Sequence, residues 1–205
     1  MSAPGTVYVV DDDAGMRKAL ARLTQAAGLR SRTFASAAEF LDQESLESPA
    51  CIVLDIHMPG LSGLDLQAEL AKRNLQTPIV FITGYGDVPS SVRAMKAGAV
   101  DFLTKPFNNR NLIEVMRNAV RKDASRQAGA AEREAIQRRL GTLTPREMEV
   151  LKLVLRGLLN KQIAAELGAS EQTIKVHRGR VMDKMQMQSV AELVQAAVKV
   201  GLVTA

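Results

Sequence analysis

Short apolar runs alternate with amphipathic stretches through the first 120 residues of the chain. A continuous apolar run suits a strand that is buried on both faces, and helical spacing of apolar residues indicates an amphipathic helix. The alternation therefore predicts a βα repeat with a parallel sheet. The expected strands are 7–10, 30–34, 51–54, 79–82 and 101–103, and the expected helices are 14–27, 36–45, 63–73, 87–97 and one from 109 onward.

Five strands and five helices in this length predict a flavodoxin-like, doubly wound sheet of the α/β class. In such sheets, ligands bind outside the carboxyl ends of the strands. Candidate chemistry is therefore expected where each strand ends.

From Leu143 the pattern becomes all-helical. Thr144, followed by Pro145 and then Glu147, has the order of a capping box at a helix start. Four helices are expected: one to Arg156 that stops at Gly157, one over 160–167, one capped by Ser170 through Met185, and one capped by Ser189 to about Val200. A short helix, a glycine turn and a longer basic helix form a helix-turn-helix.

Residues 121–142 lie between these regions and contain no apolar stripe wide enough for a core. They are rich in Ala, Glu, Gln and Arg, which favour helix. Two interpretations remain open: a solvated, partly frayed linker, or a rod that continues the preceding helix. We favour the rod, which would reach about Arg138, stop at Gly141 and be weakest at Gly129. The expected organisation is thus residues 1–120, a helical linker 121–142, and an all-α domain 143–205.

Charge separates the two halves of this 205-residue chain. Residues 1–120 hold 12 basic and 13 acidic side chains, whereas 121–205 hold 15 and 9. The basic half is the candidate for binding a polyanion. No export signal or membrane-spanning stretch is evident, and the single cysteine, Cys51, lies within an apolar run and is expected to be a buried hydrophobe. These features predict a soluble, cytoplasmic protein that binds no membrane.

Polar residues follow four of the expected strands. If the sheet forms, these strand ends bring carboxylates, a hydroxyl and an ammonium to one edge. Asp13 is also expected to cap the first helix, and the Lys105–Pro106 bond could be cis. The residues are Asp11, Asp12 and Asp13 after the first strand, Asp55 at the third, Thr83 and Gly84 at the fourth, and Lys105 and Pro106 after the fifth.

Clustered carboxylates form a hard-oxygen site that suits one Mg²⁺. Asp12 and Asp55 would bind it directly and Asp11 through water, whereas the separated His57 and His177 give no support for zinc. Asp55 would then be a nucleophile towards a phosphoryl group. The other strand-end residues would stabilise phosphate oxygens: Lys105 and Thr83 by contact, and Gly84 by allowing close backbone approach.

The helix that follows Ser170 is basic and comes after a tight turn, as expected of an element that enters the major groove of DNA. Lys175, Arg178, Arg180 and Lys184 supply the positive charge, with Thr173, Val176 and His177 between them. His177 is expected to pack or to contact phosphate. Gly179 is unfavourable in mid-helix, so it leaves the roles of Arg178 and Arg180 open.

The segments "VVDDD", "LDIHMPGLSGLDL", "FITGYGD" and "AMKAGAVDFLTKPF" resemble the receiver domain of bacterial two-component response regulators. The segment "LTPREMEVLKLVLRGLLNKQIAAELGASEQTIKVHRGRVMDKM" resembles the LuxR-type DNA-binding domain. Together they resemble the NarL/FixJ class, nearer to its FixJ branch, over nearly the whole chain.

The resemblance implies a phosphorylation-controlled transcription factor that is not an enzyme. A sensor histidine kinase would phosphorylate Asp55, with Mg²⁺ on Asp11, Asp12, Asp55 and the carbonyl of His57. Thr83 and Phe102 would form the switch pair, although many receivers carry tyrosine where Phe102 stands. Phosphorylation would convert a monomer into a homodimer through the surface within 88–120, promote binding to double-stranded promoter DNA, and regulate transcription with RNA polymerase, most simply as an activator.

For the DNA contacts, the resemblance places Lys175 and Val176 near the bases, and Asn160 and Lys161 at the backbone. The full expected set is Asn160, Lys161, Ser170, Thr173, Lys175, Val176, Arg178 and Arg180.

Two other functions also fit parts of the pattern. A magnesium-dependent aspartyl-phosphate phosphatase also uses a strand-end Asp and a Lys, but such enzymes usually carry a second acid two residues after the nucleophile, where this chain has His57. Alternatively, the protein could bind DNA independently of phosphorylation, with the receiver as a protein-binding platform.

Overall fold

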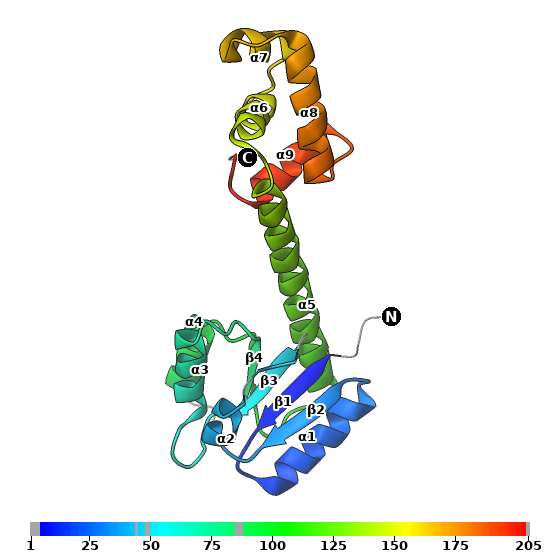
Figure 1. The fold of residues 1–205 in the computed structure, drawn as a ribbon. Helices are drawn as coiled ribbons and strands as arrows, with labels where there is room; N and C mark the ends of the chain where they lie inside the picture. Colours follow the sequence, from blue (N-terminus) through cyan, green and yellow to red (C-terminus); the bar gives the residue numbers. More distant parts are fainter. Residues whose placement is uncertain (1–4, 44, 48–49, 85–87, 204–205) are drawn as a thin grey trace. The chain divides into compact units, whose positions relative to one another are not determined.

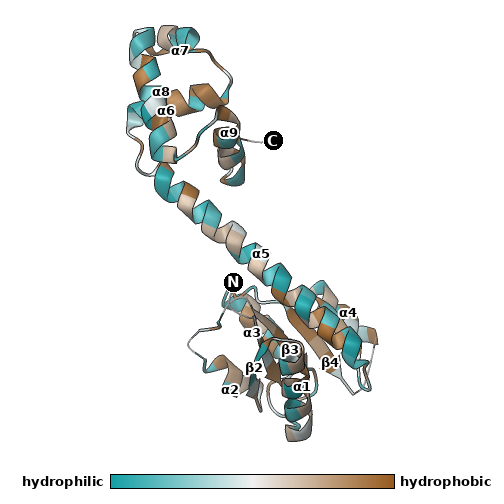
Figure 2. Cartoon of the chain, turned by 90° about the vertical axis from the view of Figure 1, so that its right-hand side faces the viewer, coloured by the Kyte–Doolittle hydropathy of each residue, from teal (hydrophilic) through white to brown (hydrophobic). Residues whose placement is uncertain are grey.

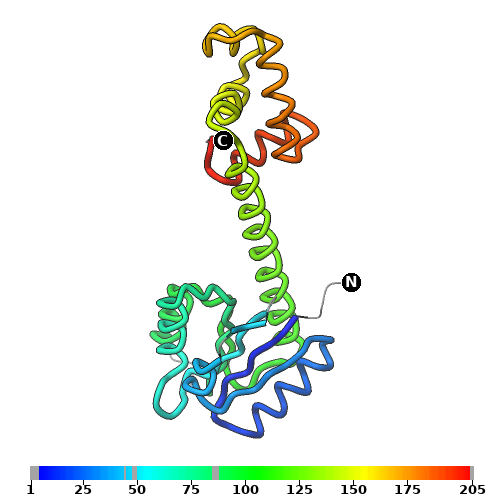
Figure 3. Tube along the Cα trace, in the orientation of Figure 1, coloured from blue at the N-terminus to red at the C-terminus, as the bar shows by residue number. Residues whose placement is uncertain are grey.

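The computed structural model describes residues 5–43, 45–47, 50–84 and 88–203. The chain forms two compact units, one up to Gln127 and one from Ala128. Figure 3 follows the chain through each of them. The division falls inside a single helix, α5 (Asn109–Leu140), so the two units are covalently joined by helical backbone.

A five-stranded parallel sheet forms the centre of the first unit (Figure 1). Its strand order, β2-β1-β3-β4-β5, is the flavodoxin-like order that the sequence predicts. Every residue of β1, β3 and β4 is buried, which explains why these strands are mainly apolar. The strands are β1 (Thr6–Val10), β2 (Arg30–Phe34), β3 (Ala50–Asp55), β4 (Ile79–Thr83) and β5 (Asp101–Thr104).

Helices cover both faces of this sheet. α1 (Ala14–Ala26) and the first part of α5 pack on one face, where Leu20 and Met116 meet Val9 and Val53. α2 (Ala37–Leu41), α3 (Gly63–Lys72) and α4 (Val88–Lys96) pack on the other. Figure 2 shows β3 and β4 as mainly hydrophobic between these helices.

The second helix is shorter than the sequence predicts. It ends at Leu41, whereas the sequence predicts a helix to residue 45. Asp42 caps α2 by donating its backbone N–H to Ala38, and Leu46 packs on the core separately after the helix has ended. Positions 44 and 87, which belong to the expected helices 36–45 and 87–97, lie outside the described residues.

The long helix α5 is continuous through Gly129 and ends at Leu140, as the rod interpretation expects. The segment 121–142 nevertheless contributes to packing, which the sequence analysis did not anticipate. Ile136 is 3% exposed and belongs to the core of the second unit, with Leu140 packed beside it. The bounds of a separate linker therefore stay a prediction.

Four further helices complete the second unit. Thr144 accepts a hydrogen bond from the N–H of Glu147, whose carboxylate accepts from the N–H of Thr144, so the expected capping box is present. Ser170 and Ser189 cap their helices as expected. No helix within the described ranges is long and apolar enough to cross a membrane. The helices are α6 (Pro145–Leu155), α7 (Asn160–Leu167), α8 (Glu171–Met185) and α9 (Val190–Lys199).

Candidate phosphoacceptor site and DNA-binding surface

Three strand ends bring opposite charges into contact at the carboxyl edge of the sheet. Asp11 follows β1, Asp55 ends β3, and Lys105 follows β5. The Nζ atom of Lys105 donates to Oδ2 of Asp11 at 2.9 Å and to Oδ2 of Asp55 at 3.0 Å. Asp11 is 0% exposed and Asp55 is 6% exposed. The parallel register explains this convergence, because Val10 pairs with Leu54 and the next residues on both strands reach the same edge.

The acidic turn after β1 is held by its own hydrogen bonds. Asp13 donates its N–H to Oδ1 of Asp11 at 2.8 Å and accepts from the N–H of Met16 at 2.9 Å, so it caps α1 as expected. Arg17 donates to the carbonyl oxygens of Asp11 and Asp12, each at 2.8 Å. Sequence reasoning missed Arg17; its place one turn into the helix after the acidic run was the available signal.

Burial and pairing act in opposite directions on these charges. Burial raises the pKa of Asp11, although the hydrogen bond from Lys105 opposes that increase. For Lys105, burial alone would lower the pKa, but hydrogen bonds and charge from Asp11 and Asp55 outweigh it and raise the pKa. The hydrogen bond from Met16 lowers the pKa of Asp13. The ammonium of Lys105 is therefore firmly held as a cation at the edge.

Three carboxylates at this edge could share one cation. Asp11, Asp12 and Asp55 each offer an oxygen, and these atoms lie within 4.8 Å of one another. Hard oxygen donors at this spacing fit Mg²⁺ and give no preference for a softer metal. The backbone N–H of His57 contacts Oδ1 of Asp55 at 3.4 Å, which keeps residue 57 in the same turn.

The remaining predicted receiver residues surround this edge. Thr83 is 0% exposed at the end of β4, and Gly84 follows it at the surface. The Lys105–Pro106 bond is cis, as the sequence analysis allowed. Phe102 is half-buried in β5 and packs against the core that contains Ala94.

Gly63 supports the site in a way that the sequence analysis did not identify. It begins α3 and donates its N–H to the carbonyl of Ile56 at 2.9 Å. A Cβ atom at this position would lie 2.2 Å from the carbonyl oxygen of Asp55. Only glycine lets α3 approach the backbone of Asp55 so closely. The segment "LDIHMPGLSGLDL" contains this glycine, but sequence spacing does not show that Gly63 lies against the backbone of Asp55.

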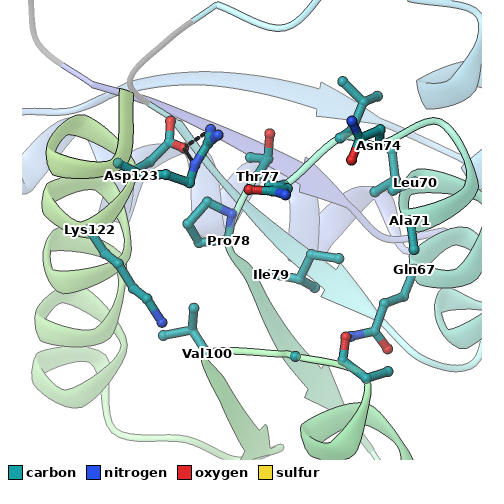
Figure 4. A pocket seen from close by; sticks show the side chains of 15 residues that line it. Gln67, Leu70, Ala71, Asn74, Thr77, Pro78, Ile79, Val100, Lys122 and Asp123 are labelled. Carbon is teal, nitrogen blue, oxygen red and sulfur yellow. Dashed lines mark hydrogen bonds and ion pairs between the residues drawn. The ribbon is translucent and has the colours of Figure 1, made fainter. Parts of the chain in front are cut away.

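A cavity of about 440 Å³ lies at the opposite ends of the strands, where Ile79 begins β4 and Val100 precedes β5 (Figure 4). Asp123 of α5 lines this cavity, and its Oδ2 atom accepts a hydrogen bond from the backbone N–H of Ala50 at 2.8 Å. Arg126 also pairs with Asp123, at 2.6 Å.

Cys51 follows Ala50 on β3. Burial, with a smaller contribution from the Asp123 charge, raises the pKa of Cys51 to about 12, so Cys51 is the inert buried residue that the sequence predicts.

In the second unit, α7 and α8 form the expected helix-turn-helix. Gly168 ends α7 with φ of 60°, a left-handed conformation that favours glycine. Lys175 is exposed on α8 and Val176 is 45% exposed beside it. The fold places the other predicted DNA contacts on the same two helices: Asn160 and Lys161 begin α7, Ser170 and Thr173 form the cap of α8, and Arg178 and Arg180 lie further along α8.

Several of these polar side chains already have partners. Arg178 donates to Oδ1 of Asn160 at 3.0 Å, which links two predicted contacts. Lys184, one of the four residues that supply the expected positive charge of α8, donates instead to Glu147 at 2.6 Å and to the carbonyl of Thr142 at 3.0 Å. The hydrogen bond from Lys184, together with that from Thr144, lowers the pKa of Glu147 to about 2. Lys184 therefore joins α8 to the start of α6.

Comparisons with known proteins agree with this two-part architecture. Residues 7–117 match the model of the response regulator receiver domain, and residues 141–197 match that of bacterial regulatory proteins of the luxR family. The chain is 46% identical to nodulation protein W of Bradyrhizobium diazoefficiens over 98% of this chain and 88% of the relative. It is 42% identical to the transcriptional regulatory protein FixJ of the same organism, over 98% of both chains.

A solved structure described as the response regulator StyR matches with a TM-score of 0.87 and 44% identity, covering 96% of this chain and 100% of that one. Fold and sequence similarity thus agree for both units. The chain belongs to the NarL/FixJ class of two-component response regulators, which are DNA-binding regulators of transcription with a receiver domain and a LuxR-type helix-turn-helix domain.

Proposed function

We propose that Asp55 accepts a phosphoryl group from a sensor histidine kinase. The observation that carries this proposal is the position of Lys105, 2.9 Å from Asp11 and 3.0 Å from Asp55. In the transfer, the bond from phosphorus to the kinase histidine nitrogen breaks as a bond to an oxygen of Asp55 forms. An ammonium beside that oxygen stabilises the charge on the phosphoryl oxygens.

The other residues of the edge have supporting roles in the same transfer. Asp11, Asp12, Asp55 and the carbonyl of His57 would hold one Mg²⁺, which supplies positive charge to the phosphoryl oxygens when bound. The hydroxyl of Thr83 donates a hydrogen bond to a phosphoryl oxygen, and Gly84 leaves room for the phosphoryl group. The receiver thereby assists its own phosphorylation and dephosphorylation, but it turns over no separate substrate.

Phosphorylation then promotes pairing of two copies of the chain. Exposed apolar side chains gather on α4, where Val88 is 71% exposed, Val92 43% and Met95 46%. Thr83 moves towards the phosphoryl group, Phe102 changes its rotamer, and the surface of α4, β5 and the start of α5 becomes competent to pair. Two or three charge-assisted hydrogen bonds of about 1.5 to 3 kcal/mol each supply about 3 to 9 kcal/mol, a range that includes the about 5.5 kcal/mol needed to reverse a 1:99 equilibrium.

The dimer binds double-stranded promoter DNA through α8 of each copy and activates transcription with RNA polymerase. Lys175 and Val176 face the bases, while Asn160 and Lys161 meet the DNA backbone. Ser170, Thr173, Arg178 and Arg180 complete the contact surface. The net positive charge of residues 121–205 supports binding of a polyanion.

The test compares the wild-type protein with Asp55→Asn, and with Asp42→Asn as a matched exposed control. With acetyl phosphate and Mg²⁺, the wild-type and Asp42→Asn proteins should gain one phosphoryl group by mass spectrometry and form dimers by analytical ultracentrifugation. Asp55→Asn should do neither. An Asp55→Asn protein that gains the group and dimerises as the wild type does would show that Asp55 is not the phosphoacceptor.

A further inference from the structure

The side chain of His57 makes a contact that the phosphoacceptor chemistry does not use. His57 lies two residues after Asp55, and any residue at this position could supply the backbone carbonyl to a cation. Its ring atom Nδ1 lies 3.2 Å from the hydroxyl oxygen of Thr83. The imidazole therefore touches the one hydroxyl that has to reach the phosphoryl group.

The two partners differ sharply in exposure. Thr83 is 0% exposed, whereas His57 lies at the surface. A buried hydroxyl that loses a hydrogen bond cannot replace it with bulk water, so the contact with His57 helps to fix where this hydroxyl lies. The turn from Asp55 to His57 is short, and the N–H of His57 also contacts Oδ1 of Asp55 at 3.4 Å. One residue thus touches both the phosphoacceptor and the switch residue.

A hydroxyl group has a single proton to donate. If Thr83 donates it to Nδ1 of His57, the same proton is not available to a phosphoryl oxygen on Asp55. Donation to Nδ1 requires the neutral imidazole with its own proton on Nε2, the nitrogen that is not in contact with Thr83.

We propose that His57 is a positioning residue that holds the Thr83 hydroxyl on its imidazole before phosphorylation, and that the switch begins when Thr83 exchanges this acceptor for a phosphoryl oxygen. The inference rests on the proposed phosphorylation of Asp55. It assigns to His57 a restraint that opposes activation. Removal of the ring should therefore make the active arrangement easier to reach.

The experiment titrates the full-length protein with beryllofluoride, a phosphoryl mimic, in the presence of Mg²⁺. The readouts are the amide NMR signals of Thr83 and Gly84 and the dimer fraction by analytical ultracentrifugation. His57→Leu should lower the midpoint of both readouts about fivefold, the equivalent of one hydrogen bond of about 1 kcal/mol. His57→Asn should stay near the wild-type midpoint, because its side-chain amide oxygen can accept from Thr83.

Two controls separate this restraint from a general disturbance of the turn. The Mg²⁺ affinity of each variant is measured without beryllofluoride, and the midpoints are compared at saturating Mg²⁺, so that a change in metal binding does not produce the shift. In a Thr83→Val background, which lacks the hydroxyl, His57→Leu should no longer shift the midpoint. His57→Ala provides a second variant at this exposed position should the leucine perturb folding.

An unchanged or raised midpoint in both His57→Leu and His57→Ala would overturn the inference, and so would a shift that persists with Thr83→Val. A raised midpoint would mean that His57 donates to Thr83 and orients its hydroxyl towards phosphate. If the wild-type protein itself shows no response that depends on Asp55, the proposed function fails and the inference fails with it. A wild-type response without a His57 effect removes the inference alone.

Discussion

The receiver unit and the DNA-binding unit carry their functional side chains in different ways. At the receiver edge, Lys105 contacts two carboxylates that are 94 and 50 residues away in the sequence, Asp11 and Asp55. In the second unit, most of the proposed DNA contacts lie on one helix, α8, and on its cap. The receiver site exists only if a sheet forms in the correct register, whereas the proposed DNA-binding surface needs only two helices that are adjacent in the sequence, α7 and α8.

This difference also affects how each charge can be interpreted. Buried Asp11 and Asp55 are costly without a partner, so their contact with Lys105 is itself evidence for a site. A basic residue on a surface helix carries no such cost. The structure shows that Lys184 joins two helices while Lys175 stays exposed on the same helix. Convergence therefore supports the proposed phosphoacceptor site, and exposure supports the proposed DNA-binding surface.

The largest effect is expected at the convergent site. Lys105→Met keeps the length of the side chain but removes its charge, so the phosphoryl oxygens lose an electrostatic partner. The rate of phosphorylation by acetyl phosphate should fall about 10²- to 10³-fold. Phosphate incorporation followed over time by mass spectrometry measures this rate.

Lys72→Met is the matched control, because Lys72 is 70% exposed and pairs with Glu69 on the surface of α3. Its rate should stay near the wild-type value. Comparable rates for Lys105→Met and the wild type would mean that convergence at the edge does not identify the reacting residues.

A smaller effect is expected on the free energy of unfolding, and it should differ in sign between substitutions at Gly63 and Gly179. Gly63→Ala would place a Cβ atom 2.2 Å from the backbone of Asp55, so the first unit should lose about 3 kcal/mol of unfolding free energy. Tyrosine fluorescence during urea unfolding measures this, because both tyrosines of the chain precede Gln127.

Gly179→Ala is the contrasting substitution, on α8. A Cβ atom there meets nothing within 4 Å, and alanine favours helix over glycine by about 1 kcal/mol. Hydrogen exchange of α8 amides should slow in this variant. Destabilisation by Gly179→Ala would show that this part of α8 is more constrained than an exposed helix.

The effect expected on DNA affinity is no larger than the stability loss at Gly63. Lys175→Ala should weaken promoter binding by about 1 to 3 kcal/mol. The wild-type dimer, with about 8 phosphates neutralised, should show a log–log salt slope near −7. Fluorescence anisotropy over a salt series measures both quantities.

Lys184→Ala is the matched basic substitution on the same helix. It should leave the salt slope unchanged but lower the unfolding free energy of the second unit, because Lys184 bonds to buried Glu147. The reverse result, a smaller slope with unchanged stability, would place Lys184 on the DNA-binding surface. A wild-type slope near zero would remove the DNA-binding proposal.

Local patterns predicted much of the fold. Apolar runs located the strands, and the caps Asp13, Thr144, Ser170 and Ser189 located helix starts, because each depends on residues that are near in sequence. The strand-end rule also predicted the encounter of the carboxylates with Lys105. The shorter α2 and the burial of Ile136 were not predicted, because both depend on packing against distant elements.

The sequence by itself determined the βα repeat, the helix-turn-helix and the residue types available for phosphate and DNA chemistry, because periodicity and capping are local properties of the chain. Only the tertiary structure decided which of these side chains meet. The contact of His57 with Thr83, the approach of Gly63 to Asp55 and the capture of Lys184 by Glu147 each depend on a loop path or rotamer set by long-range packing. Hydrogen bonds act over about 3 Å, and sequence spacing alone does not fix distances on that scale.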